Sequence, residues 1–333
     1  MSPSPYALFV GVDIAAATFT AVWARPDAAP HPAQTFDQTP AGFHAFQERL
    51  AATGAAPAAT LVVLEATGSY WIALAVALHD ADYHVSVINP ARILNYARSL
   101  PRRAKTDALD AHVLAQFAAE RRPAVWTPPP QVYHELRQRL VTRDALLQMR
   151  QQARNQRHAL LQWPVVVPTV RQQFDEIIAD LDERIDQLET GIVTLLRDSA
   201  WAESAALLSS IPGLGPLTTA WLLVTTINFT ACPSVAAAIA YAGLAPMAHD
   251  SGSSVHERPR IGHAGNTRLR TALYLATLSA AQHNPMIKAF YTRLRAAGKP
   301  MKVARCAAAR KLLELAWAVV AKRQRFDPAY AER

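Results

Sequence analysis

The sequence has few cysteines and no long uninterrupted apolar stretch. Its two cysteines, Cys232 and Cys306, lie far apart and outside any CxxC or histidine-containing metal motif. This scarcity excludes a disulfide framework and a zinc site, and it fits a reducing cytoplasm. No run of about eighteen apolar residues is free of charges, and residues 1–6 lack a basic segment. We therefore expect no membrane span, no export signal and a cytoplasmic location.

The composition predicts a folded protein with more than one domain and a polyanionic partner. Of the 333 residues, 51% are hydrophobic and 18% are charged, which is enough for two separate cores. The net charge is +8, but residues 256–325 hold fifteen Lys or Arg against two Glu. A helix surface can be basic without binding anything, yet such surfaces usually carry acids in similar numbers. This end of the chain therefore favours a nucleic acid as partner.

The first 121 residues alternate between predicted strands and helices. Four apolar runs predict strands at residues 6–12, 18–23, 59–64 and 83–88, the first two forming a hairpin. Predicted helices follow at residues 39–50, 70–81, 89–100 and 107–121, the last with Thr106 as its N-cap. This alternation indicates an α/β domain with a mixed or parallel sheet wrapped by helices.

Four acids are expected at one edge of that sheet. Asp13 and Glu65 follow buried strands, while Asp107 and Asp110 stand three residues apart on one helix face. Ligands gather at the carboxyl ends of parallel strands, and carboxylates suit Mg²⁺ or Mn²⁺. Taken singly, each acid is as well explained as a turn residue or a first-turn helix acid. Their joint placement favours a metal site.

The middle of the chain predicts a helical hairpin. The proline-rich stretch 122–130 marks a domain boundary, and two long helices follow at about residues 131–163 and 170–197. The first helix is rich in arginine and the second in acids, which suggests an antiparallel, charge-complementary pair. The second helix also carries an unbroken coiled-coil seam, Phe174, Ile178, Leu181, Ile185, Leu188, Ile192 and Leu195. We expect a scaffold that pairs with a second protomer; nucleic-acid binding by the arginines is the alternative.

Two stretches of the last third are candidates for phosphate binding. Gly213 and Gly215 lie between two apolar helices, as in a helix-hairpin-helix, although a plain helical turn uses the same residues. A Ser/Gly-rich segment, residues 247–254, reads as a flexible loop, and four arginines follow it: Arg258, Arg260, Arg268 and Arg270. Such loops are more often linkers, but arginines in this number favour a bound phosphate. No GxSxG motif occurs, which excludes an acyl-transfer serine of that kind.

Eight short motifs together resemble a known family. They fall in this order: Phe9-Val-Gly-Val-Asp13, Leu64-Glu65-Ala-Thr-Gly-Ser-Tyr70, Val87-Ile-Asn-Pro90, Lys105-Thr-Asp107-Ala-Leu-Asp110-Ala, Ile211-Pro-Gly-Leu-Gly215, Ala242-Gly-Leu-Ala-Pro246, Ser251-Gly252 and Gly265-Asn-Thr-Arg268-Leu-Arg270. The sequence resembles the insertion-sequence 110 family of transposases, the DEDD class, also called bridge-RNA-guided recombinases. The resemblance spans nearly the whole chain, from Leu8 to Asp327.

The resemblance implies the fold and role of the first and last of three expected domains. Residues 1–125 would form a ribonuclease H-like (RuvC-like) catalytic domain whose metal-binding tetrad is Asp13, Glu65, Asp107 and Asp110. Between them, the apolar spacing and complementary charges described above predict a coiled-coil hairpin for dimerisation at residues 131–200. Residues 205–328 would form a mainly α transposase domain with the nucleophilic Ser251, which matches the family through its Ser-Gly pair.

The resemblance also implies the activity and the partners. Metal bound by the tetrad, Mg²⁺ or Mn²⁺, would assist Ser251 in forming a covalent phosphoserine during DNA cleavage and rejoining. Donor and target DNA, a structured guide RNA from the element and a homodimer that assembles into a tetramer are the expected partners. A metal-dependent Holliday-junction-type endonuclease using water and a non-catalytic nucleic-acid-binding scaffold are the alternatives.

Overall fold

The computed structural model describes residues 5–100, 107–251, 255–262 and 264–329, with the backbone alone described for residues 247–251 and 255–260. The chain divides into two compact units, Met1–Pro128 and Pro129–Arg333. The predicted N-cap Thr106 lies outside the described residues. Within the described part of the chain, no helix is both long enough and apolar enough to cross a membrane.

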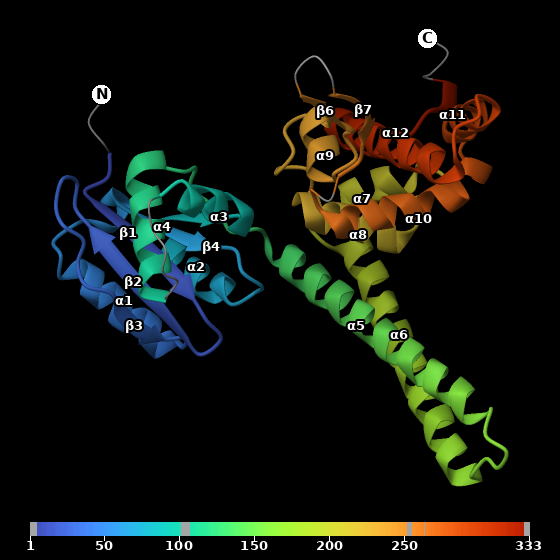
Figure 1. Ribbon diagram of the computed structural model, residues 1–333, viewed down its shortest axis with the longest axis horizontal. Helices are drawn as coiled ribbons and strands as arrows, with labels where there is room; N and C mark the ends of the chain where they lie inside the picture. The colour runs from blue at the N-terminus through green and yellow to red at the C-terminus, as the bar shows by residue number, and fades with distance from the viewer. Residues whose placement is uncertain (1–4, 101–106, 252–254, 263, 330–333) are drawn as a thin grey trace. The chain divides into compact units, whose positions relative to one another are not determined.

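The first unit is built around a mixed five-stranded sheet (Figure 1). Its elements are β1 (Leu8–Ile14), β2 (Thr18–Ala24), β3 (Gln34–Asp37), α1 (Pro40–Ala51), η1 (Pro57–Ala59), β4 (Thr60–Glu65), α2 (Trp71–Asp80), β5 (His84–Ile88), α3 (Pro90–Arg98) and α4 (Asp107–Arg121). The strand order is β3-β2-β1-β4-β5, with β1 parallel to β4 and antiparallel to β2. The predicted mixed sheet is confirmed, and it is consistent with a ribonuclease H-like fold.

Strand β3 is the one described strand of this unit that the sequence did not predict. It has four residues, lies at the sheet edge beside β2, and alternates between half-buried and exposed positions. The predicted strands are buried apolar runs, which a short and half-polar edge strand does not resemble. Its position is set instead by pairing with β2, a tertiary interaction.

Side-chain alternation divides the sheet into two faces with separate cores. Leu8, Val10 and Val12 of β1 pack against α1 and α2, whereas Phe9 packs with α3 and α4. The same alternation holds in β4, where Val63 faces α3 and α4. The two helical layers in Figure 1 are therefore held by different residues of the same strands.

Helix α4 lies unusually close to β1 at one glycine. A Cβ atom added to Gly11 would lie 2.1 Å from the backbone nitrogen of Ala115 and 2.3 Å from the carbonyl oxygen of Ala111. Ala111 and Ala115 are themselves buried and form a small cluster with Val22. Small residues on both elements therefore let the helix backbone rest directly on the strand.

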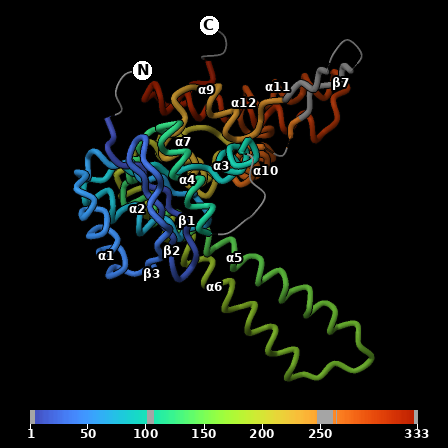
Figure 2. The backbone as a smooth tube through the Cα atoms, turned by 60° about the vertical axis from the view of Figure 1, so that its left-hand side comes forward, coloured from blue at the N-terminus to red at the C-terminus, as the bar shows by residue number. Residues whose placement is uncertain are grey.

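The second unit contains a long helical hairpin and a helical core. Its elements are α5 (Gln131–Leu160), α6 (Pro168–Asp198), α7 (Ala202–Ser209), α8 (Pro216–Thr226), α9 (Val235–Tyr241), β6 (Met247–Ser251), β7 (Val255–Arg260), α10 (Thr267–His283), α11 (Pro285–Ala296) and α12 (Met301–Lys322). One buried cluster joins the start of α5 and the end of α6 to the later helices. The hairpin extends from this core, as Figure 2 shows.

Arginines of α5 pair with acids of α6 along the hairpin. Arg143 Nε lies 2.6 Å from Glu189 Oε1, and Arg154 Nη2 lies 3.1 Å from Asp182 Oδ2. Arg150 also pairs with Asp182, and Arg157 pairs with Asp175. Every residue of the predicted seam in α6 is buried or half-buried. These ion pairs occupy four arginines of α5, which favours a scaffold over nucleic-acid binding by this helix.

We expect the Gly11→Ala substitution to loosen α4. Its added methyl group would overlap backbone atoms, which cannot move aside as a flexible side chain can, and overpacking of this kind costs about 3 kcal/mol. Hydrogen exchange of the α4 amides and the thermal unfolding midpoint measure the effect. The control is Gly54→Ala, where a Cβ atom would lie 4.0 Å from Arg25 Nη2 but φ is +77°; there we expect a loss of about 1 kcal/mol and no change in α4. Equal exchange in both variants would contradict the prediction.

Candidate active site

Two of the four predicted acids lie side by side at the end of the parallel strands. Asp13 is the next-to-last residue of β1 and Glu65 is the last residue of β4. Val12 pairs with Leu64, so Asp13 and Glu65 follow at the next position of two neighbouring parallel strands. By alternation both share the sheet face of Phe9 and Gly11, the face that α4 covers.

Helix α4 brings the other two acids to the same edge. Asp107 and Asp110 occupy its first turn, where Asp107 is exposed and Asp110 is half-buried. Ala111, the residue after Asp110, lies against Gly11, which is two residues before Asp13. The helix contact therefore places the α4 acids beside the end of β1.

The charges of the four acids act on one another. The pKa of Asp13 is raised to about 6, most strongly by burial and then by the charges of Asp110, Asp107 and Glu65, in that order. The backbone N–H of Ile14 opposes this by stabilising the carboxylate. Among the described residues, no ion pair involves any of the four acids. The site therefore concentrates negative charge that no described cation balances.

The donor set fits a hard divalent cation. All four groups are carboxylates, the ligands that Mg²⁺ and Mn²⁺ prefer, and their mutual repulsion is what a cation would relieve. Thr67 Oγ1 donates to Glu65 Oε1 at 2.8 Å, which orients that carboxylate. Among the described side chains, no three His, Cys, Asp or Glu converge closely enough to form a ready-made metal cage. The acids thus share one neighbourhood without being drawn to ligand distances.

Ser251 lies at the end of a strand. Residues 247–251 were expected to belong to a flexible loop, and that expectation is wrong, because they form β6 and pair with β7. Ser251 pairs with Val255, at the end of the described pairing between the two strands. The rival serines Ser253 and Ser254 lie outside the described residues. Arg258 and Arg260 belong to β7, in the strand that returns from the serine.

The segments directly before β6 and directly after β7, called here the feet of the hairpin, meet at two glycines. The Asn266 N–H donates to the Tyr241 carbonyl oxygen at 2.7 Å, and Asn266 Nδ2 donates to the Tyr241 hydroxyl at 3.1 Å. A Cβ atom on Gly265 would lie 2.5 Å from the backbone nitrogen of Gly243, and both glycines have positive φ. The chain therefore enters and leaves the hairpin at one point.

Arg270 ties these feet together. Its Nη1 donates to the Ala264 carbonyl oxygen at 2.9 Å and to the Gly243 carbonyl oxygen at 3.5 Å, and its Nη2 donates to Thr267 Oγ1 at 3.3 Å. The sequence predicted a phosphate contact for this side chain. Its guanidinium bonds the segments before and after the hairpin that carries Ser251, and phosphate binding by Arg270 stays a prediction.

Arg268 joins the helical hairpin to the C-terminal core. Its Nη2 lies 2.7 Å from Asp144 Oδ2 of α5, and its Cζ lies 5.0 Å from the centroid of the Trp221 ring. The side chain remains 46% exposed, so part of the guanidinium still faces solvent. Phosphate binding by Arg268 stays a prediction.

The two glycines between α7 and α8 have different surroundings. A Cβ on Gly213 would lie 2.5 Å from the Cβ of Ala280 in α10, so packing explains why glycine stands there. Gly215 is exposed and has no neighbour within 4 Å of a Cβ, and it precedes the first turn of α8. Its side of the turn is open to a ligand.

The sequence reasoning did not identify Gly11, Thr67 or Asp144, although each positions a candidate residue. Thr67 follows Glu65 by two residues and Gly11 precedes Asp13 by two, so the motifs that carried the resemblance contained both. The alternation along β1 predicts that Gly11 and Asp13 share a face. Asp144 gave no such signal, because its partner lies 124 residues away.

Comparison with known proteins supports the reading of both units. Residues 10–163 match a transposase family of the DEDD type, and residues 205–292 match the transposase IS116/IS110/IS902 family. The pilin gene-inverting proteins of Moraxella bovis and Moraxella lacunata are each 32% identical over 321 residues, covering 96% of this chain and 97% of their own. A 43.6 kDa protein of the IS110 insertion element from Streptomyces coelicolor is 36% identical over 115 residues, 34% of this chain and 28% of its own length.

These matches cover both units of the chain. The alignments with the gene-inverting relatives cover nearly the full length of both chains. The transposase families cover the strands and the helix that hold the four acids, and helices that follow the α5–α6 hairpin. The acid cluster and the basic C-terminal region are what an enzyme acting on DNA needs. The chain belongs to the IS110 family of transposases and is a DNA transposase or recombinase.

Proposed function

We propose that this protein cleaves and rejoins the DNA strands of an insertion sequence. Asp13, Glu65, Asp107 and Asp110 would hold the divalent metal, and Ser251 would be the nucleophile. The observation that carries the proposal is the placement of four carboxylates at one sheet edge, where β1 and β4 end side by side and α4 rests on Gly11. The raised pKa of Asp13 agrees with this placement.

The reaction can be written for the chain's own atoms. Ser251 Oγ attacks the phosphorus of the scissile phosphodiester, and the bond from phosphorus to the 3′ oxygen breaks. The serine loses its hydroxyl proton and the 3′ oxygen gains one, so a 5′-phosphoserine and a free 3′-hydroxyl result. When bound, Mg²⁺ or Mn²⁺ would polarise the phosphate oxygens. Rejoining reverses these steps with a different 3′-hydroxyl.

Arginines near Ser251 would hold the DNA. Arg258 and Arg260 lie on the strand that pairs with the serine strand, and Arg268 keeps part of its guanidinium in solvent. Exposed Gly215 would let a phosphate approach the first turn of α8. The basic helices α10 to α12 would add the affinity that depends on salt.

The proposal includes a guide RNA and self-association, as the family resemblance implies. A structured RNA would pair with donor and target DNA, and a homodimer would assemble into a tetramer. The hairpin α5–α6 would serve as a coiled-coil dimerisation element. Its tip supports this, because Trp163 is 68% exposed and Val165 is 80% exposed. Large apolar side chains in such number at one tip favour a protein contact.

Two alternative functions are less well supported. An endonuclease that uses water would cut DNA without rejoining it, whereas gene inversion, the activity in the name of the full-length relatives, requires rejoining. A non-catalytic scaffold would need no cluster of repelling carboxylates, which destabilises the metal-free protein.

We expect Ser251→Ala to abolish the covalent protein–DNA adduct and to leave DNA binding near normal. The hydroxyl is the attacking group, and its loss removes no charge that attracts DNA. Denaturing gel electrophoresis of a labelled DNA substrate measures the adduct. Ser253→Ala and Ser254→Ala are the matched controls and should keep it. Adducts that survive Ser251→Ala would remove this serine from the mechanism.

We expect Asp107→Asn to reduce strand cleavage by at least about 100-fold, because an amide is a poorer metal ligand than a carboxylate. The measurement is the rate of strand cleavage with saturating Mg²⁺. The control is Asp80→Asn, which changes an exposed acid at the end of α2 in the same unit. Full activity of the wild-type protein after removal of all divalent metal by a chelator would argue against the tetrad.

We expect Asp13→Asn to stabilise the metal-free protein at pH 8. The folded-state pKa of Asp13, about 6, exceeds its ordinary value of 3.8. The wild-type protein therefore loses stability as the pH rises from 3.8 to about 6. The shift corresponds to about 3 kcal/mol, and solvent screening at this half-exposed side chain reduces it to about 1 kcal/mol. Differential scanning calorimetry should show a gain of about 3 °C at pH 8 that vanishes near pH 4. A gain independent of pH would contradict the assignment.

A further inference from the structure

A cavity lies between the feet of the β6–β7 hairpin and helix α12. Its volume is about 380 Å³. The feet of the hairpin contribute Leu244, Pro246 and Ile261, and α12 contributes Lys302, Val303, Cys306, Ala307 and Arg310. The cavity therefore adjoins the residues directly before and directly after the hairpin that carries Ser251.

The described lining is apolar within and cationic at the rim. Lys302 and Arg310 are exposed, and no acid is among the described lining residues. Arg310 Nε lies 3.3 Å from Glu314 Oε1, whereas Lys302 makes no ion pair with a described residue. Val303 is 52% exposed, which leaves a large apolar side chain facing water at the mouth. Such a lining suits a flat apolar group that carries negative charges beside it.

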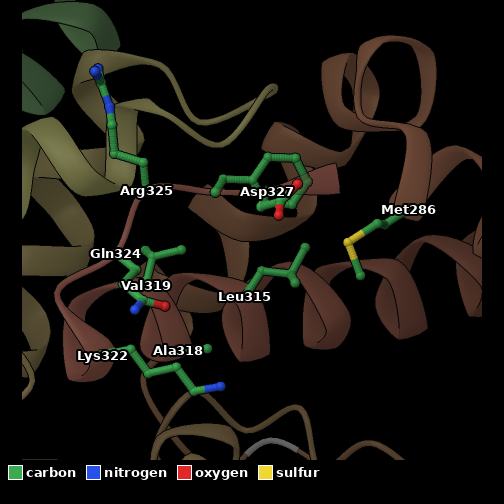
Figure 3. Close-up of a pocket in the computed structure, with 9 residues that line it drawn as sticks. Met286, Leu315, Ala318, Val319, Lys322, Gln324, Arg325 and Asp327 are labelled. Atoms are coloured by element: carbon green, nitrogen blue, oxygen red, sulfur yellow. The ribbon is translucent and has the colours of Figure 1, made fainter. Parts of the chain in front are cut away.

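A second cavity of this unit differs in its volume and in the charges of its lining. It lies between α11, the end of α12 and the segment that follows, and its volume is about 120 Å³ (Figure 3). Asp327 lines it together with Lys322, so it offers both signs of charge. The cavity beneath the hairpin is thus larger, and its described charges are all positive.

We propose that the cavity beneath the hairpin holds the base of an unpaired DNA nucleotide, with Lys302 and Arg310 on the flanking phosphates. This proposal rests on the proposed function, because the serine hairpin would bring cut DNA to this place. A volume of about 380 Å³ lies near the lower end of the range for small organic ligands, so one base fits and a duplex does not. A base beside a strand break has lost part of its stacking and is easily turned outward.

The test compares DNA duplexes that differ only at one bulged nucleotide. The probes are a 30-base-pair duplex with a single 2-aminopurine bulge, the same duplex with an abasic bulge and the fully paired duplex. Anisotropy of a dye on the duplex end gives the dissociation constants, in EDTA so that no cleavage occurs. We expect the full-length protein to bind the base bulge about tenfold more tightly than the abasic bulge. Equal affinity for the two bulges would overturn the proposal.

Variants of the lining locate the effect. We expect Val303→Ser, which removes apolar surface, and Ala307→Phe, which fills the cavity, to abolish the tenfold preference while binding of the paired duplex is unchanged. Met301→Ser is the matched control, because Met301 is 49% exposed on the same helix but does not line the cavity. A preference that persists in both lining variants would place the base elsewhere. Tighter binding of the equivalent bulged RNA duplex would overturn the choice of DNA.

Cys306 provides an independent readout of position. A bulged base that carries an activated disulfide can exchange with a nearby thiolate, forming a mixed disulfide and releasing the leaving thiol. We expect the wild-type protein and Cys232→Ser to form this adduct and Cys306→Ser to lose it, because Cys232 is buried in the helical core. A missing adduct in the wild type would contradict the proposal. Neither assay needs Ser251, so both report on the cavity even if Ser251→Ala retains strand cleavage.

Discussion

The contact between α4 and β1 at Gly11 is the constraint on which the acid cluster depends. The acids come from three separate elements, and like charges would drive those elements apart. At Gly11 the backbone of α4 lies against the strand, with no side chain between them to give way. Apolar packing on either side, with Ala111 and Ala115 buried, fixes the helix that carries Asp107 and Asp110. Packing of small residues thus offsets the electrostatic repulsion among the four acids in the metal-free protein.

In the second unit the arginines divide between internal and external roles. Arg143 and Arg157 are paired with acids of α6, and Arg270 bonds backbone carbonyls at the base of the β6–β7 hairpin. Pairs of this kind hold helices and loops in register, while exposed cations such as Lys302 remain available for phosphates. The number of arginines in this unit therefore exceeds the number of cations that are left free for phosphates.

Regular elements with a strong local pattern were predictable, and features made by tertiary contact were not. The buried runs that became β1, β4 and β5 identified the sheet, and the position of Asp13 and Glu65 after two of them predicted their meeting at one edge. Strand β6 was missed because its sequence, rich in small and polar residues, resembles a loop. The contacts of Arg270 were also not predictable, because its carbonyl acceptors come together only through the close approach of Gly243 and Gly265. The position of a guanidinium in the sequence does not reveal which acceptor it will meet.

The closed base of the β6–β7 hairpin makes it a modular arm. Because Tyr241 and Asn266 are bonded to each other, the helices on either side are joined independently of the length of chain between them. Insertions or deletions of residue pairs in the two strands would change the distance of Ser251 from the base of the hairpin and leave α9 and α10 undisturbed. A transposase built this way could adapt its reach to differently shaped DNA junctions while keeping its helical body.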